Sequence, residues 1–600
     1  MYQIKNIYKT ALVLVVAATL GSSCTKQLDQ TPQSSGTRDV IFGSSDALAL
    51  YSNSFYDVLP AIGDVFRTDP NLSDYGATNA VPDFIRPNVF TARQSSGWTW
   101  TALRNINYFL ANNTNEKIPQ TVRENYNGMA RFARAWFYFN MVKRFGNVPW
   151  IGRPLSITDT TILYAGRDPR TLVMDSVLAD VNYAISHITL TTDATRSQFT
   201  KWIAYGLKSR ICLFEGTFRK YQTDYNLTTT ANQWLQESVN ASKAIMDSAG
   251  FSVSSGNGTD LSYRSLFISA APVSSEIMLA DVTSPSLAVL NDANWFYTSA
   301  TYGNRFNFTR TFINTYLNID GTPFTDIAGH DTMTFAHEMQ NRDKRLSQTI
   351  RTPGYTRVNN GTVQAAPPLF SYTYTGYQPI KWCLDDMYYD AGTLNTNSVT
   401  VMRYAEILLN YAEARSELGQ LTDDDWTKTV GALRKRAGIT GGLTAKPTVV
   451  DTYLQTNYFP GISDPSLLEI RRERGIELVL EGFRFDDLRR WKKGDLLLKS
   501  WNGFYVPALN TPLDLNGDGK LDVRFYQGTA PTAISGVTDI NVSATLSGST
   551  NPMQLSNGTY GEIHWLDNIA RQWDDYRYIY PIPYTDLTIN PKLGQNPGWQ

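Results

Sequence analysis

The stretch "GMARFARAWFYFNMVKRFG", residues 128–146 of the 600-residue chain, decides the fold class. Its large apolar residues recur at steps of three and four, which is the spacing of one face of an α-helix. They are Met129, Phe132, Trp136, Phe137 and Met141. Gly146 follows the pattern, in the place where a glycine commonly ends a helix. The stretch therefore predicts a helix with one wide apolar face that must pack against other elements.

The same periodicity returns in "RYAEILLNYAEARSELG", residues 403–419, where Gly419 again marks the end. Ala412 and Ala414 in this stretch are small enough to let a paired helix approach closely. We expect further helices at Trp100–Asn112, Leu172–Ile188, Lys201–Phe214, Gln233–Ser248, Asp424–Ala437 and Pro465–Trp491. A chain with this many amphipathic segments is predicted to be mostly α-helical.

The N-terminus reads as an export signal. Lys5 and Lys9 precede an apolar block at 11–20 that is too short to span a bilayer, and the small residues 21–23 lead directly to Cys24. This order resembles a bacterial lipobox, so we expect a signal peptide at 1–23 and lipidation of Cys24. A transmembrane segment is the alternative, but no stop-transfer charge cluster follows. Residues 24–37 are polar and are predicted to be a flexible tether.

Composition limits the partners. The 54 basic residues nearly match the 55 acidic ones, so no overall field favours nucleic acid or an anionic bilayer. The chain has 34 Tyr and 14 Trp, more than a core usually needs, which indicates rings that face solvent or a flat ligand. Beyond Cys24 only Cys212 and Cys383 remain. A disulfide between them is possible, but buried free thiols are the expected state.

Two long stretches differ from the helical segments. Residues 251–400 and 501–574 are rich in Ser, Thr, Asn, Gly and Tyr, with only short apolar runs. We divide the folded body into a helical part at 38–250, a loop-rich ligand-binding region at 251–400, and a C-terminal helical part at 401–600 with a loop insertion at 501–574. Loops presented by a rigid scaffold commonly carry function.

Several stretches, taken in order, resemble the SusD/RagB family of outer-membrane nutrient-binding lipoproteins. "LDQTP" at 28–32 follows the lipobox cysteine, and "RFARAWFYFNMVKRFGNVPWI", "RYAEILLNYAEA" and "LRKRAGI" come next. The most specific matches are "RRERGIELVLEGFRFDDLRRW" at 471–491 and "YIYPIPYTDLTINPKLGQNPGW" at 578–599. These stretches cover nearly the whole mature chain.

The resemblance implies a scaffold of four tetratricopeptide-like helix pairs with a second, loop-rich region packed on it. It also implies a surface-exposed, lipid-anchored protein of the cell outer membrane. Such a protein captures an oligosaccharide and passes it to a partner, a SusC-like TonB-dependent outer-membrane transporter. The family is not an enzyme family, and it implies no required cofactor.

Four carboxylates recur at four-residue steps, at Glu469, Glu473, Glu477 and Glu481. A metal or acid–base site is one interpretation, but a carboxylate-bridged metal site needs Glu-x-x-His partners, and none of the four histidines is so placed. Such a stripe repels itself unless cations match it. We therefore predict pairing with buried or half-buried arginines between helices. Those at hand are Arg471, Arg472, Arg474, Arg484, Arg489 and Arg490.

The stretch "DLNGDGKLD", residues 514–522, matches part of a calcium loop. Its ligand positions 1, 3, 5, 7 and 9 are Asp514, Asn516, Asp518, Lys520 (through its carbonyl) and Asp522, and Gly519 stands at the sharp turn. Position 12 is Phe525, so the usual bidentate Glu is missing. A bound structural calcium and a pair of Asn-Gly and Asp-Gly turns both remain open.

A sugar-binding site needs aromatic faces for the C–H faces of pyranose rings and polar groups for the hydroxyls. Two loop clusters supply both. "NDANWFYTSATYGNRF" at 291–306 and the N-terminal loops at 71–100 provide the predicted glycan-binding residues: Asn294, Trp295, Tyr297, Tyr302, Arg305, Asp74, Tyr75 and Trp98. Trp100 is assigned to the core.

Two other function classes remain open at this stage. Some relatives in the family serve peptide importers, for which a backbone-binding or acidic groove would be expected. An enzyme acting on surface glycans would need paired carboxylates that converge in a cleft.

Overall fold

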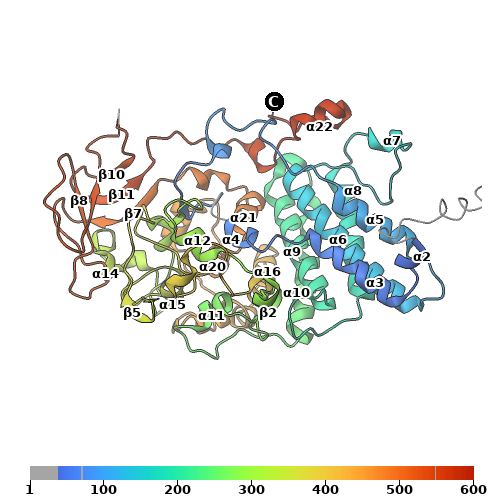
Figure 1. Cartoon of the computed structure of the whole chain (residues 1–600), viewed down its shortest axis with the longest axis horizontal. Coiled ribbons are helices and arrows are strands. Elements are labelled where there is room, and N and C mark those ends of the chain that lie inside the picture. Colours follow the sequence, from blue (N-terminus) through green and yellow to red (C-terminus); the bar gives the residue numbers. More distant parts are fainter. Residues whose placement is uncertain (1–37, 69–71, 547–548, 600) are drawn as a thin grey trace, which may run out of the picture.

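The structure is a computed structural model that describes residues 38–68, 72–546 and 549–599. Figure 1 shows a helical half that holds most of the N-terminal third of the chain, beside a half rich in loops and short strands. The mostly α-helical fold class is confirmed. The signal peptide, Cys24 and the tether lie outside the described residues. No helix within the described residues is long and apolar enough to cross a membrane.

The helical half is built from long helices packed side by side. Neighbours along the chain contact one another, α6 with α5 and α8, and α9 with α8 and α10; α16 then packs on α10 and α20. The assignment to four repeated pairs stays a prediction. The bounds are α3 Ser45–Ser52, α5 Thr101–Asn112, α6 Gln120–Phe145, α8 Arg170–His187, α9 Lys201–Tyr221, α10 Ala231–Ser248, α16 Tyr404–Glu417 and α20 Pro465–Glu477.

Glycines end and join these helices. Gly146 caps α6 with a φ of 72°, a left-handed value that favours glycine, as the sequence predicted. Gly216 on α9 lies against α10, where an added Cβ would come within 2.8 Å of Leu235 Cγ and 2.9 Å of its backbone nitrogen. The close packing of α9 on α10 therefore needs a residue without a side chain at position 216.

Two predicted helices are each two helices. The segment 424–437 divides into α17, Asp423–Lys428, and α18, Val430–Arg436, at Thr429, whose φ of −114° and ψ of −93° are not helical. The segment 465–491 divides into α20 and α21, Arg484–Arg490. Between them Leu480 and Gly482 have φ values of 59° and 83°. Neither break contains a proline, and the apolar and charged pattern continues across both. The sequence therefore predicted one helix in each segment.

Short paired strands connect segments of the loop-rich half to one another. A three-stranded antiparallel sheet has the order β10–β11–β7, and the other sheets have two strands each. The strands of three or more residues are β2 Ile277–Asp281, β4 Thr356–Asn359, β5 Thr362–Ala365, β6 Val399–Arg403, β7 Trp501–Val506, β8 Val523–Tyr526, β9 Thr538–Asn541, β10 Met553–Leu555 and β11 Gly561–Trp565. Strands β2 and β6 pair antiparallel, which ties the loop-rich region to the start of α16.

The loop-rich region has an aromatic core of its own. Phe306, Phe308 and Phe312 are buried there with Tyr377 and Trp382, in a cluster separate from that of the long helices. Phe306 and Phe308 meet edge to face at 5.1 Å. From its composition this region was expected to have few core positions. The buried rings stabilise the loop-rich region although it has little regular secondary structure.

The carboxylate stripe is paired with buried arginines, as predicted, but most of the partners come from other elements. Arg434 contacts Glu469 at 2.5 Å, Arg403 contacts Glu477 at 2.6 Å and Glu481 at 2.7 Å, and Lys381 contacts Glu481 at 2.6 Å. Among the arginines on α20 and α21, Arg472 forms an ion pair with the stripe, through Glu469. The stripe therefore joins α20 to the segments packed on it. Cys212 and Cys383 are both free and buried.

Candidate functional site

The cluster at 291–305 forms a half-exposed aromatic surface. Trp295, on the short helix α12 (Ala293–Thr298), stacks on Tyr302 with ring centroids 3.7 Å apart and planes 14° apart. Both rings are half-buried. The structure therefore brings Trp295 and Tyr302 together, and both rings are partly exposed.

The Tyr302 hydroxyl of this pair is held by a buried carboxylate and an arginine. Asp292 is buried and accepts a hydrogen bond of 2.5 Å from the Tyr302 hydroxyl. It also pairs with Arg67 of α4 (Asp64–Thr68), whose Nη2 lies 3.2 Å from the same hydroxyl. The bond to Asp292 raises the pKa of Tyr302, with burial adding to the effect. Tyr302 therefore stays a neutral donor, and its ring is fixed in orientation.

Arg305 joins the loop that carries the first pair to a second pair. Its Nε and Nη2 donate to Ala300 O at 2.9 and 2.7 Å, and its Nη1 donates to the Tyr374 hydroxyl at 3.2 Å. Tyr374 stacks on Trp565 of β11 with centroids 3.9 Å and planes 9° apart. The φ of Arg305 is 48°, an uncommon conformation for a residue with a side chain. We call Trp295, Tyr302, Arg305, Tyr374 and Trp565 the aromatic arc.

The sequence prediction missed Tyr374 and Trp565. Both are half-buried, and the Trp565 indole nitrogen donates to Thr78 O at 2.8 Å. They lie about 70 and 260 residues beyond Arg305 in the chain, so only the fold brings them together. The one local signal was the place of Trp565 in "EIHW", where its alternation with Ile563 is typical of a half-buried strand.

Four of the predicted glycan-binding residues are buried in the core. Asp74 pairs with buried Arg484 at 2.6 Å, and the Tyr297 hydroxyl donates to Phe66 O at 2.6 Å. Tyr75 is 1% exposed and packs against Phe312. Asn294 is fully buried. A side chain without an exposed face cannot stack on a sugar, so these four are corrected to structural roles.

Asn294 has a defined structural task. Its side-chain oxygen accepts from Leu384 N and from Asn395 Nδ2, each at 2.7 Å, and its Nδ2 donates to Leu384 O at 2.9 Å. These bonds fasten α12 to the 384–395 loop. They therefore also fix the position of Trp295, the next residue in the chain.

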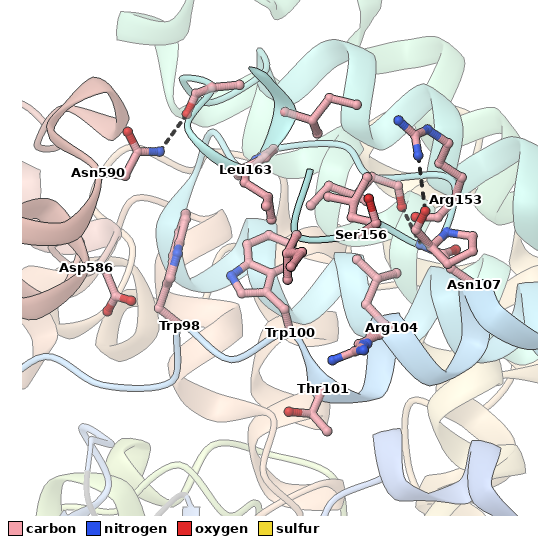
Figure 2. A pocket seen from close by; sticks show the side chains of 18 of the residues that line it. Trp98, Trp100, Thr101, Arg104, Asn107, Arg153, Ser156, Leu163, Asp586 and Asn590 are labelled. Atoms are coloured by element: carbon pink, nitrogen blue, oxygen red, sulfur yellow. Dashed lines mark hydrogen bonds between the residues drawn. The ribbon is translucent and has the colours of Figure 1, made fainter. Parts of the chain in front are cut away.

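Trp98 lies in a different place. Figure 2 shows it beside Trp100 in a pocket of about 530 Å³ that no residue of the 291–305 cluster lines. The two indoles meet edge to face at 5.3 Å, and Trp98 also packs on Phe145. Trp100, assigned to the core, is half-buried and lines the same pocket. The two predicted clusters therefore do not form one site.

In the segment 514–522, predicted to match part of a calcium loop, the carboxylates do not converge on one point. Asp514 Oδ1 accepts from the backbone nitrogens of residues 516 and 517, and its Oδ2 accepts from that of Gly519. Asn516 and Asp518 accept in the same way from residues 518 and 520, the latter being Lys520, and Asp522 accepts from Leu515 N. Among the described residues no three Asp, Glu, His or Cys side chains are grouped to hold a metal. The geometry is that of nested Asx turns.

Two family models cover most of the chain. The model described as "SusD family" matches residues 290–599, and the model described as "Starch-binding associating with outer membrane" matches residues 27–213. The chain belongs to the SusD family. A curated SusD-like protein of Formosa agariphila is 24% identical over 547 residues, which cover 86% of this chain and 97% of that protein.

Solved SusD-like structures share the fold. One from Bacteroides fragilis aligns with a TM-score of 0.66 at 20% identity, covering 94% of this chain and 98% of that one. A SusD-like carbohydrate-binding protein of the same species aligns with a TM-score of 0.65 at 18% identity, covering 92% and 99%. A laminarin-binding SusD-like protein aligns at 0.55 with 16% identity, covering 92% and 99%. At these identities the likeness shows the fold alone.

Ser500, His564 and Asp567 lie together in this SusD-family chain, and their geometry is not that of a hydrolase triad. Ser500 Oγ and Asp567 Oδ2 both contact His564 Nδ1, at 3.2 and 2.6 Å, and Ser500 also donates to Asp567 at 2.6 Å. A triad needs the serine on one ring nitrogen and the carboxylate on the other. The hydrogen bond to Asp567 raises the pKa of His564.

Proposed function

We propose that this protein captures an oligosaccharide on the aromatic arc. The single observation that carries the proposal is the pair of parallel ring stacks, Trp295–Tyr302 and Tyr374–Trp565, with the Arg305 guanidinium hydrogen-bonded to the Tyr374 hydroxyl. Two ring stacks, one of them with a hydrogen-bond donor beside it, suit pyranose rings, whose apolar faces stack while their hydroxyls bind the guanidinium. Membership of the SusD family and carbohydrate-binding neighbours of the same fold support it.

We further propose that the protein is anchored at the outer membrane through lipidated Cys24 and delivers its ligand to a TonB-dependent transporter. The lipobox-like order at 21–24 supports the anchor, and the family model that mentions the outer membrane supports the location. The protein would then act by binding and transfer, without catalysis. Cys24→Ala should leave the protein without an acylated N-terminus, and mass spectrometry that still finds the acylated, membrane-bound form would refute the anchor.

The test of ligand class is calorimetric titration of the mature protein with two oligosaccharide series and one peptide series. The laminarin series is included because one structural neighbour is titled laminarin-binding, and the starch series because one family model is described as starch-binding. Affinity should rise from short to longer saccharides until both stacks are occupied. Binding of the peptides with none of the saccharides bound would favour peptide capture and refute the proposal.

A further inference from the structure

The guanidinium of Arg305 keeps hydrogen-bond donors that the protein itself does not use. A guanidinium has five N–H groups. Two of those on Arg305 donate to Ala300 O, at 2.9 and 2.7 Å, and one donates to the Tyr374 hydroxyl, at 3.2 Å. Two N–H groups therefore remain, one on each terminal nitrogen, and the side chain is only half-buried. These are the groups that a ligand can reach.

The charge of Arg305 is not neutralised by the protein. Among the residues that the structure describes, no Asp or Glu forms an ion pair with its guanidinium. Asp292 is the acid held beside the first ring stack, but it is buried, and it already pairs with Arg67 and accepts from the Tyr302 hydroxyl. Two arginines against one aspartate leave this group of residues with one positive charge.

Arg305 lies close to the second ring stack. Its guanidinium carbon is 5.7 Å from the centroid of the Tyr374 ring, which stacks on Trp565, and both rings are partly exposed. A pyranose that stacks on an aromatic ring carries its exocyclic C6 group at the edge of its flat face. An anionic group at that position extends beyond the stacked face, toward groups at the border of the ring. The guanidinium of Arg305 is such a group.

The remaining polar groups of the aromatic arc are donors as well. Among the described residues neither the indole N–H of Trp295 nor the hydroxyl of Tyr374 donates a hydrogen bond. None of the five members of the arc is acidic. A sugar hydroxyl both donates and accepts, so on this surface its proton would lack a charged acceptor, whereas carboxylate and sulfate groups only accept. The arc therefore matches a ligand that is rich in acceptors.

We propose that the saccharide captured by the aromatic arc is acidic and carries a carboxylate or sulfate group that binds Arg305. This inference rests on the proposed function, because it names the class of ligand for the same site. Hydrogen bonds from a guanidinium to an anion are roughly twice as strong as those between neutral groups, and they can form in parallel pairs. A uronic acid and a sulfated sugar share this chemistry, and the experiment separates the two.

Neutral saccharides and acidic peptides fit these groups less well. A neutral saccharide can stack on the rings, but it forms no hydrogen bond between two charged groups with Arg305. An acidic peptide brings carboxylates on side chains that rotate freely and lose conformational entropy when they are fixed. Such side chains also lack the flat C–H face that two ring stacks can hold.

The experiment is calorimetric titration of the mature protein with oligosaccharides of the laminarin and starch series. Each is used at one length in three forms: neutral, oxidised to a carboxylate at C6, and sulfated at C6. One of the acidic forms should bind about fivefold or more tightly than its neutral parent, and the form that does so identifies the anion. Added salt should reduce this advantage, because Arg305 is half-exposed and its charge is screened.

Three variants separate the charge from the rings. Arg305→Gln should remove the preference for the acidic form and leave the affinity for the neutral form unchanged, whereas Arg305→Lys keeps the charge and should keep part of the preference. Trp295→Ala should weaken both forms by the same factor. Arg104→Gln is the matched control, because Arg104 is exposed on α5 in the helical half and forms no ion pair among the described residues. It should bind like the parent, and thermal melts confirm that each variant is folded.

Several results would overturn the inference. Equal or weaker binding of both acidic forms would do so and leave the proposed function standing, as would a preference that survives in Arg305→Gln. A fall in the affinity for neutral and acidic forms alike in Arg305→Gln would show that Arg305 only holds the loop. Acidic peptides that bind through Arg305, with no saccharide bound, would refute the inference together with the proposed function.

Discussion

Replacing Trp295 by alanine tests the aromatic arc directly. The ring stacks on Tyr302 at 3.7 Å, and its neighbours Asn294 and Phe296 are buried, so truncation removes a surface ring and leaves the helix anchored. In proteins that stack nucleic-acid bases on aromatic rings, replacing one such ring by alanine costs roughly 1–3 kcal/mol of binding free energy. Tyr302 remains held by Asp292 and still offers a ring, which places the expected loss near the low end.

The expected result is about a tenfold rise in Kd, the equivalent of about 1.4 kcal/mol. The stack itself contributes about 0.5–1.5 kcal/mol to folding, so the melting temperature should fall by no more than a few degrees in a chain of this size. Trp295→Phe keeps a ring at the same place and should recover most of the affinity.

The assay is calorimetric titration of each variant with the best saccharide of the panel, beside thermal melts. Tyr108→Ala is the control, because Tyr108 is an exposed aromatic residue on α5, in the helical half and outside the arc. Unchanged affinity in Trp295→Ala, for a saccharide that the parent binds, would refute the placement of the site. A fall in melting temperature of ten degrees or more would show that the ring belongs to the core.

Three further outcomes follow from the buried and titrating groups. Asp74→Ala should cost about 3–5 kcal/mol of stability, because it removes a buried carboxylate that pairs with the guanidinium of Arg484 at 2.6 Å, and saccharide affinity should not change; melts and titration check both. Burial raises the pKa of Asp281 to about 6, so its charge opposes folding increasingly from about pH 4 to pH 6 and fully above that. Asp281→Asn should therefore raise the melting temperature at pH 8 and leave it unchanged at pH 4, and equal gains at both would refute this cause. Because Asp514 already binds three backbone amides, a chelator should leave the melting curve unchanged, and a lower melting temperature would reveal a bound cation.

The scaffold was predictable because its helices repeat one signal over many residues. The pattern at 128–146 and the glycine after it gave the core and the end of α6, and the same pattern gave α16. The breaks in 424–437 and 465–491 were not predictable in this way. Thr429 and Leu480 leave the helical conformation because of packing in the folded protein, and neither residue type signals a break.

The sequence predicts only some members of the proposed arc. Polar and aromatic residues at 291–305 do lie at the surface loop that carries the arc, but the same composition also serves to fasten that loop. Tyr297 and Trp295 are two residues apart on a single helical turn, so one faces the core while the other faces outward. A short helix within a loop has too little sequence for its periodicity to be read. Tyr374 and Trp565 needed the tertiary fold.

The residues that were mistaken for ligands explain why the arc is held in place. Asn294 fastens α12 through three hydrogen bonds, and Tyr297 ties the same helix to Phe66 O, next to the Arg67 that binds Asp292. Each bond limits the motion of Trp295 or Tyr302, so under the proposed function the rings would meet a ligand already oriented and would lose little entropy on binding. Substitutions of Asn294 would therefore weaken binding by releasing the position of Trp295, although Asn294 itself has no exposed surface. A scan of this loop that measured affinity alone would count Asn294 among the sugar contacts; measuring stability beside affinity separates the residues that fasten the arc from those that bind.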